Sequence, residues 1–153
     1  MDFICFDAPI GFMALAAEGN ALVRVYLPNT PVPRLMSRET PLLAKARTEL
    51  LEYLNGERKT FDLPMKTEGT PFQERVWSAL CRIPCGQVRT YQQIAEEAGS
   101  PRGALPVGSA LSRNPLPILI PCHRVIASDG SLSGYAGGAE LKRYLLALEG
   151  YVR

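Results

Sequence analysis

The first third of the chain alternates hydrophobic and polar residues with the two-residue period of β-strands. Two such runs, residues 13–18 (MALAAE) and 21–27 (ALVRVYL), are separated only by Gly19-Asn20. A two-residue connection between alternating runs predicts a β-hairpin with a tight turn. We therefore expect a small sheet near the amino terminus.

A helix is predicted after the proline-rich connection at residues 28–34 (PNTPVPR). Thr40-Pro41 is typical of a helix start, and Asn55-Gly56 is typical of a helix end. Between them, apolar residues recur on one helical face at Leu43, Ala46, Leu50 and Leu54. The aperiodic residues 63–69 (LPMKTEG) that follow are interpreted as a linker.

The second part of the chain begins as a run of short helices, each with its own start signal. Thr70 to Gln73 has the composition of a capping box with proline at the first helical position, and Val76, Trp77 and Leu80 would form the buried face. Thr90 to Gln93 repeats the capping box, and Gly99 ends that helix after about two turns.

A third helical segment, residues 104–112 (ALPVGSALS), follows after a short connection. Helix, turn and helix in this order are typical of a DNA-binding helix-turn-helix. The small residues Gly108 and Ser109 would let this helix lie close to a backbone, either that of DNA or that of the protein itself. Asp129-Gly130 predicts a turn that could form a wing, and residues 140–148 predict a closing amphipathic helix.

These patterns together predict an α+β protein. A small N-terminal α/β domain, residues 1–65, is followed by a C-terminal winged-helix (helix-turn-helix) domain, residues 66–153. The composition, 46% hydrophobic and 21% charged, is that of a folded globular chain and excludes disorder. No apolar run approaches the roughly 18 residues of a membrane span, and the amino terminus has acidic flanks. We therefore expect a cytoplasmic protein with no membrane association.

Positive charge is concentrated in the second part of the chain. Residues 1–69 hold 8 basic and 9 acidic side chains, whereas residues 70–153 hold 9 basic and 6 acidic ones. The basic residues from Arg75 to Arg124 are all arginines, whose planar guanidinium suits contacts with phosphate. This pattern is compatible with nucleic-acid binding, although a solvated basic face is a common alternative.

Four cysteines occur in the sequence, and a cytosolic location predicts that they are reduced thiols. Cys81 and Cys85 have a spacing that could suit a metal, but the chain has only one histidine to complete a set of ligands. We therefore interpret both as buried structural thiols and expect neither a metal nor another cofactor.

Residues 114–124 (NPLPILIPCHR) combine three prolines with the most reactive side chains of the chain. The prolines predict an extended segment that ends at Cys122 and His123. A thiolate is the nucleophilic form of cysteine, and lowering the thiol pKa to about 5 would raise its fraction roughly 30-fold. Neighbours in an extended segment point to opposite faces, so a water would connect the two side chains, and Glu149 is a candidate to orient the imidazole. Alternatively, Cys122 and His123 are ordinary core residues.

These residues resemble the O6-alkylguanine-DNA alkyltransferases, also called methylated-DNA–protein-cysteine methyltransferases. Asn114-Pro115 and the intact string Pro121-Cys122-His123-Arg124-Val125 match the core string of that family. The resemblance covers residues 70–150, and the first 65 residues match only in size and general α/β character. Further similar strings are Val88 to Ile94, Val107-Gly108, Gly134 to Gly138 and Leu148 to Gly150.

The resemblance implies repair of DNA by direct, irreversible, single-turnover transfer of an alkyl group from O6-alkylguanine to Cys122. His123 would take the thiol proton through a water, Glu149 would orient His123, and Asn114 would brace the active-site turn. Tyr91 would help to neutralise the departing guanine.

The resemblance also implies how the damaged base is recognised. The backbone of Val125 would read the exocyclic amine, and Tyr135 with the Ala136 amide would address O6. The implied partner is double-stranded DNA that contains O6-alkylguanine, bound by a monomer without cofactor, and O4-alkylthymine is a second candidate lesion. Extrusion of the nucleotide from the duplex would cost a few kcal/mol.

One position departs from the family pattern. An arginine that fills the gap left by the flipped base is replaced here by Leu105. Leu105 would act as an apolar wedge, or Arg102 or Arg113 would reach across. Two alternatives remain: a non-catalytic DNA-binding protein that senses alkylguanine, and a cysteine hydrolase unrelated to DNA.

Overall fold

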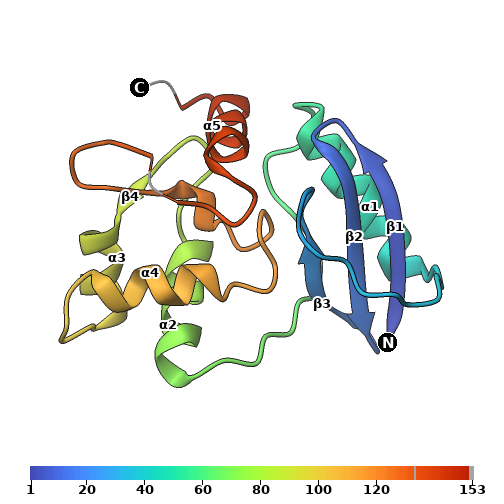
Figure 1. Ribbon diagram of the computed structural model, residues 1–153, viewed down its shortest axis with the longest axis horizontal. Coiled ribbons are helices and arrows are strands. Elements are labelled where there is room, and N and C mark those ends of the chain that lie inside the picture. Colours follow the sequence, from blue (N-terminus) through green and yellow to red (C-terminus); the bar gives the residue numbers. More distant parts are fainter. Residues whose placement is uncertain (133, 152–153) are drawn as a thin grey trace. The chain divides into compact units, whose positions relative to one another are not determined.

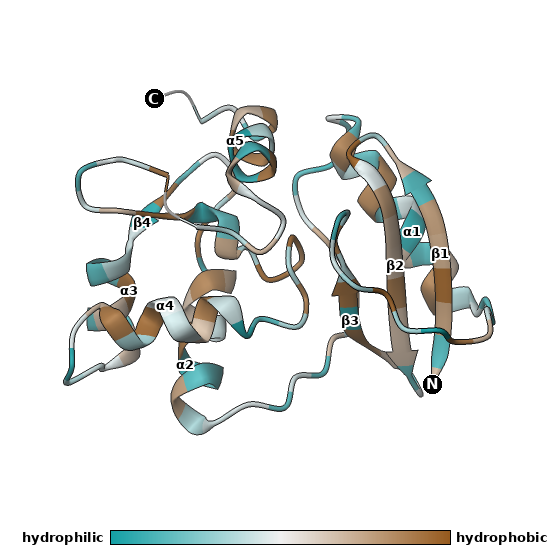
Figure 2. Ribbon diagram, in the orientation of Figure 1, coloured by the Kyte–Doolittle hydropathy of each residue, from teal (hydrophilic) through white to brown (hydrophobic). Residues whose placement is uncertain are grey.

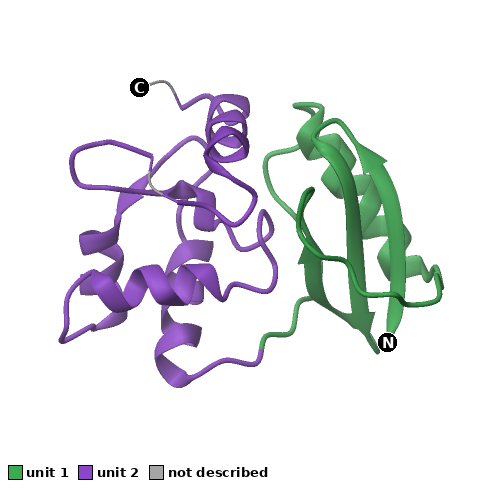
Figure 3. Ribbon diagram, in the orientation of Figure 1, with its two compact units in different colours: residues 1–67 green, residues 68–153 purple. Residues whose placement is uncertain are grey.

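The computed structural model describes residues 1–132 and 134–151. The chain divides into two compact units, unit 1 with residues 1–67 and unit 2 with residues 68–153 (Figure 3). Unit 1 contains a three-stranded sheet and one long helix, whereas unit 2 is mainly helical (Figure 1). With a sheet in one unit and mainly helices in the other, the chain is α+β. None of the described helices has the length and apolar character needed to cross a membrane.

Unit 1 is an antiparallel sheet covered by a helix. The strands β1 (Asp2–Ala8), β2 (Gly11–Glu18) and β3 (Ala21–Tyr26) lie in sequence order, and the predicted hairpin between β2 and β3 is confirmed. Helix α1 (Pro41–Leu54) packs on one face of this sheet (Figure 1). Its predicted start is also confirmed, because the Thr40 side chain accepts a hydrogen bond from the Leu43 amide at 3.2 Å.

Both faces of the central strand β2 are covered. Every residue from Met13 to Ala17 is completely buried, and Figure 2 shows the strands as predominantly hydrophobic. Val32, in the proline-rich connection, packs with Tyr26 against the sheet face formed by Phe3, Ala14 and Ala16. The connection therefore completes the core of unit 1.

Three helices form the framework of unit 2. Helices α2 (Pro71–Cys81), α3 (Tyr91–Ala98) and α4 (Leu105–Ser112) pack against one another. Both predicted capping boxes are confirmed, at Thr70 with Gln73 and at Thr90 with Gln93. Gly99 ends α3 with φ 69°, in the left-handed region that glycine adopts most easily.

Trp77 connects α2 directly to α4. Its buried indole Nε1 donates a hydrogen bond to the Ala110 carbonyl of α4 at 2.9 Å. The backbone at Gly69 passes so close over the indole that a Cβ there would lie 2.6 Å from the ring. The position of α4 relative to α2 therefore depends on this side chain.

The remaining part of unit 2 joins these helices to the end of the chain. Strand β4 (Arg89–Thr90) pairs in parallel with β5 (Val125–Ile126), and helix α5 (Ala139–Leu148) closes the unit. The turn at Asp129-Gly130 is present, with the Gly130 amide donating to the Ala127 carbonyl at 2.9 Å. No paired strands flank that turn in the described residues, where β5 pairs with β4.

Candidate active site around Cys122

Cys122 lies in a tight turn. The prediction that it stands at the end of an extended segment was wrong. Pro121 has φ −80° and ψ 67°, and the Cys122 amide donates to the Ile120 carbonyl at 2.8 Å, which is an inverse γ-turn. A short 3-10 helix, η1 (Cys122–Arg124), follows. Proline fixes φ near −65°, a value that turns and extended segments share, so the prolines did not distinguish them.

Asn114 holds the loop that leads to this turn. Its side-chain Nδ2 donates to the Ile120 carbonyl at 2.8 Å, and its Oδ1 accepts from the Leu116 amide at 2.9 Å. Between these contacts Ile118 has φ 74°, a left-handed conformation that costs a β-branched residue about 1–3 kcal/mol. The two hydrogen bonds of Asn114 help to offset this strain and fix the backbone before Cys122.

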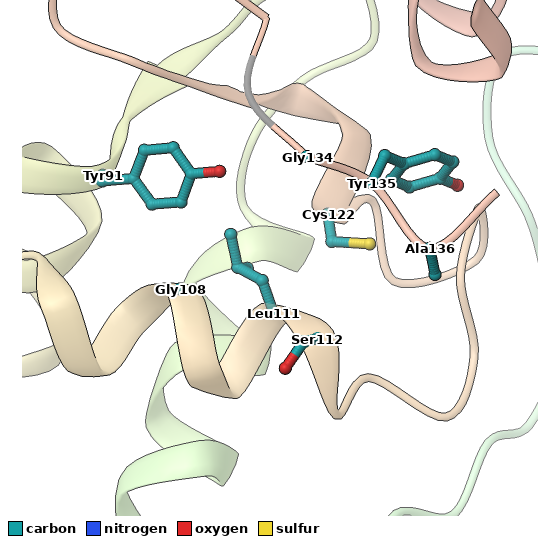
Figure 4. Close-up of a pocket in the computed structure, with 8 residues that line it drawn as sticks. All are labelled: Tyr91, Gly108, Leu111, Ser112, Cys122, Gly134, Tyr135 and Ala136. Carbon is teal, nitrogen blue, oxygen red and sulfur yellow. The ribbon is translucent and has the colours of Figure 1, made fainter. Parts of the chain in front are cut away.

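The Cys122 side chain faces a cavity of about 400 Å³ (Figure 4). Tyr91 reaches this cavity from the start of α3, and Gly108 and Leu111 reach it from α4. Its wall in the described part of the chain consists of Tyr91, Gly108, Leu111, Ser112, Cys122, Gly134, Tyr135 and Ala136. The predicted residues Tyr91, Tyr135 and Ala136 thus lie around the thiol.

His123 is completely buried beside the carboxylate of Glu149, the C-cap residue of α5. The distance from His123 Nε2 to Glu149 Oε2 is 2.7 Å. A carboxylate can only accept, so Nε2 carries the proton of the neutral ring and Nδ1 presents a lone pair. Burial, opposed by Glu149, lowers the pKa of His123 below its ordinary value, which favours this neutral form at pH 7.

Arg124 holds the same carboxylate from the adjacent position. Its Nε donates to Glu149 Oε1 at 2.8 Å, and its Nη2 donates to Oε2 at 2.9 Å. Nη1 donates to the Ile83 carbonyl at 2.7 Å. Glu149 is therefore a buried anion whose charge is balanced by a bidentate arginine, which is the condition for keeping it ionised.

The Cys122 thiol is protonated in this environment. Burial raises its pKa to about 11, although a hydrogen bond from Asn114 and the charge of Lys142 both oppose the increase. The roughly 30-fold gain in thiolate that a lowered pKa would give is therefore not present at rest. Any reaction in which this sulfur acts as a nucleophile therefore has to include removal of the proton.

Two participants in this electrostatic arrangement were missed in the sequence. Lys142 is only 1% exposed, and its ammonium group interacts electrostatically with Cys122. The spacing contained a signal, because Lys142 precedes Leu145 and Leu146 by three and four residues and so shares their buried helix face. The second, Arg124, had been named in a basic run and in the family string, but without a role at Glu149.

Other residues singled out in the sequence lie outside the cavity wall. Val125 is fully buried in β5 and does not line the cavity in the described residues. Arg102, Leu105 and Ser109 line a second hollow beside α4, and Arg113 is exposed at the C-cap of α4.

The two cysteines near the end of α2 are less buried than predicted. Cys81, the last residue of the helix, is exposed, and Cys85 is half-buried, so burial of both was a wrong prediction. Within the described residues, no group of three His, Cys, Asp or Glu side chains is arranged to hold a metal ion.

Comparison with protein families accounts for both units. Residues 3–67 match the model described as 6-O-methylguanine DNA methyltransferase, ribonuclease-like domain, and residues 71–151 match the DNA binding domain of the same family. The chain belongs to the 6-O-methylguanine DNA methyltransferase family. The resemblance inferred from the sequence strings is thereby confirmed.

Individual relatives match over nearly the whole chain. The constitutive methylated-DNA–protein-cysteine methyltransferase of Bacillus subtilis is 45% identical over 94% of this chain and 92% of its own length. A methylated-DNA–protein-cysteine methyltransferase of Methanosarcina acetivorans is 41% identical over 98% of this chain and 99% of its own length. The crystal structure of Mycobacterium tuberculosis OGT in complex with DNA superposes with a TM-score of 0.90, at 39% identity, over 97% of this chain and 92% of that one.

The raised pKa of Cys122 predicts how the thiol reacts with iodoacetamide. Because only the thiolate reacts, the rate at Cys122 should rise about tenfold per pH unit from pH 7 to 10 without a plateau. Peptide-resolved mass spectrometry measures the rate at each cysteine, and the exposed Cys5 is the internal control. A plateau for Cys122 below pH 9 would contradict the raised pKa.

Replacement of the buried carboxylate in Glu149→Gln should change both stability and the imidazole tautomer. Arg124 loses its charged partner, so the free energy of unfolding should fall by about 3 kcal/mol. The new amide can donate to Nε2, which should move the ring proton to Nδ1. Denaturant unfolding measures the first effect, and 15N NMR of the single histidine measures the second.

A matched control is Glu52→Gln, which breaks the partly exposed pair with Arg58 at 3.0 Å and should cost less than about 1 kcal/mol. An Nδ1-protonated ring in the unmodified protein would refute the assigned tautomer.

Proposed function

We propose that Cys122 accepts the alkyl group in the reaction that this family member carries out, which is repair of DNA by transfer of an alkyl group to a protein cysteine. One observation carries the assignment. Cys122 faces a cavity of about 400 Å³, and the next residue is a buried imidazole fixed by a carboxylate at 2.7 Å. This arrangement supplies a nucleophile, a base and space for a damaged base.

The thiol proton is the first requirement of the reaction. His123 Nδ1 is buried and has no hydrogen-bond partner among the described residues, so it can accept a proton through one bridging water. Glu149 then stabilises the imidazolium that forms, as the carboxylate does in catalytic triads. The Lys142 ammonium group stabilises the thiolate, since its charge lowers the pKa of Cys122.

Alkyl transfer is a single displacement at carbon. The Cys122 sulfur forms a bond to the alkyl carbon while the bond from that carbon to guanine O6 breaks. Guanine departs with the electron pair, and the Tyr91 hydroxyl helps to neutralise it. The protein retains a thioether, which carries no leaving group for hydrolysis, so one molecule repairs one lesion.

Recognition of guanine is assigned to groups near the thiol. Tyr135 and the Ala136 amide address O6, and the backbone of Val125 reads the exocyclic amine. Tyr91, Tyr135 and Ala136 line the cavity, which supports these roles. The Tyr135 ring also packs edge-on against His123, with centroids 6.4 Å apart, so it couples base binding to the position of the imidazole.

Helices α3 and α4 are assigned as the helix-turn-helix that binds duplex DNA containing O6-alkylguanine, with the turn at Asp129-Gly130 as a wing. The protein acts as a monomer. Arg102 and Arg113 are exposed and would contact phosphates, while Gly108 and Ser109 permit close approach of α4 to DNA. Leu105 at the start of α4 is 88% exposed, which suits an apolar wedge that fills the space of the flipped nucleotide.

Self-alkylation is tested by mass. Incubation with a duplex that contains one O6-methylguanine should add one CH2 to the protein, confined to the peptide that holds Cys122. Cys122→Ala should gain no mass and still bind the duplex. Binding by the unmodified protein without mass gain would instead indicate a non-catalytic sensor of alkylguanine, and repeated hydrolysis of acyl esters would indicate a cysteine hydrolase.

A wedge at Leu105 would assist methyl transfer from duplex DNA but not from single-stranded DNA. Leu105→Ala should slow methyl transfer from a duplex about tenfold, because unstacking costs a few kcal/mol and the wedge offsets part of it. Transfer from the same lesion in a single strand should change less than about twofold, since no pair is opened. Met36→Ala, at an equally exposed apolar residue of unit 1, is the matched control. Equal slowing on both substrates would exclude the wedge role.

A further inference from the structure

A second hollow lies beside α4, apart from the cavity that holds Cys122. Its volume is about 410 Å³. The beginning of α2 contributes Phe72 and Gln73, the connection before α4 contributes Arg102, and α4 itself contributes Leu105 and Ser109. An aromatic ring, an amide, a hydroxyl and one cation thus surround a largely apolar space.

Helix α4 separates the two spaces. Gly108 and Leu111 line the cavity of Cys122, whereas Leu105 and Ser109, one turn apart, line the second hollow. At about 3.6 residues per turn, the two pairs of side chains project about a third of a turn apart around α4, so the two spaces lie on different sides of the helix. Leu105 lines the second hollow and is also the residue assigned above to the gap left by the flipped nucleotide, so the hollow adjoins the position of the opposite base in the proposed complex.

Flipping a guanine leaves its former partner base without hydrogen bonds. An arginine side chain could donate to that orphaned base, but Leu105 has only carbon atoms beyond its backbone. An orphaned base kept inside the duplex beside Leu105 would have unsatisfied polar edges, and each such group is costly when it is desolvated. Another location with an aromatic face and polar groups would be more favourable for it.

We propose that the second hollow receives the orphaned base of the complementary strand. This inference rests on the proposed function, since the hollow is occupied only when the lesion is flipped. The Phe72 ring provides a face on which a base can stack, and the Arg75 guanidinium lies 5.6 Å from the centre of that ring. Gln73 uses its Oε1 for the Thr70 amide, which leaves its amide nitrogen to donate to the base. Arg102 is exposed beside the hollow, and we assign it to the phosphate next to that base.

The proposal is tested by removing a protein side chain and a DNA base, separately and together. The quantity measured is equilibrium binding to duplexes that contain O6-methylguanine. Cys122→Ala is the background, so no transfer occurs during the measurement. One duplex has cytosine opposite the lesion, and the other has an abasic site there. Phe72→Ala should weaken binding of the first duplex about tenfold through lost stacking. It should weaken binding of the second by less than about twofold, because no base is present to enter the hollow.

The controls separate this proposal from folding and from the proposed function. Unchanged affinity for the abasic duplex shows that Phe72→Ala folds, and Phe12→Ala at an exposed phenylalanine of unit 1 should affect neither duplex. Equal weakening on both duplexes would overturn the proposal and place Phe72 against the sugar-phosphate backbone. No weakening on either duplex would overturn it as well. Failure of the proposed function itself would appear separately, as absence of mass gain in the protein that retains Cys122.

Discussion

The structure around Cys122 depends on one buried carboxylate. Glu149 is reached by two consecutive residues, His123 at 2.7 Å and Arg124 through two hydrogen bonds, and Arg124 also binds the Ile83 carbonyl just after α2. This set of contacts ties the end of α5, the turn at Cys122 and the end of α2 together. A buried anion is tolerated only because its lone pairs and charge are satisfied. The same contacts therefore stabilise unit 2 and set the proton position on His123.

The surroundings of the Cys122 thiol favour its protonated form. Its pKa of about 11 means that the nucleophile forms only when a base accepts the proton in the presence of a substrate. In the proposed reaction each molecule reacts once, and a protonated thiol would limit the loss of Cys122 to small electrophiles, since only the thiolate attacks them. In the reaction proposed above, the free energy for removing the proton would come from substrate binding and from the charges of Lys142 and Glu149.

Local signals in the sequence predicted local structure well. The capping boxes at Thr70 and Thr90 and the stop at Gly99 depend on residues within one or two turns, and each was visible in the pattern. The turn at Cys122 was mistaken for an extended segment because proline permits both. The contacts of Arg124 with Ile83 and Glu149 span 41 and 25 residues, so no local pattern could contain them. Glu149 was singled out as a carboxylate of the closing helix that could orient the imidazole, and the family resemblance implied the same role, but its distance of 2.7 Å from His123 came only from the structure.

The hydrogen bond between Trp77 and Ala110 also gives the protein an optical property. Trp77 is the single tryptophan of the chain, and its buried indole touches the carbonyl side of α4. Indole emission shifts with the polarity and hydrogen bonding around the ring. The intrinsic fluorescence of this protein therefore reports on the position of α4 without any attached dye. A displacement of that helix can be followed in real time as a shift in the emission maximum.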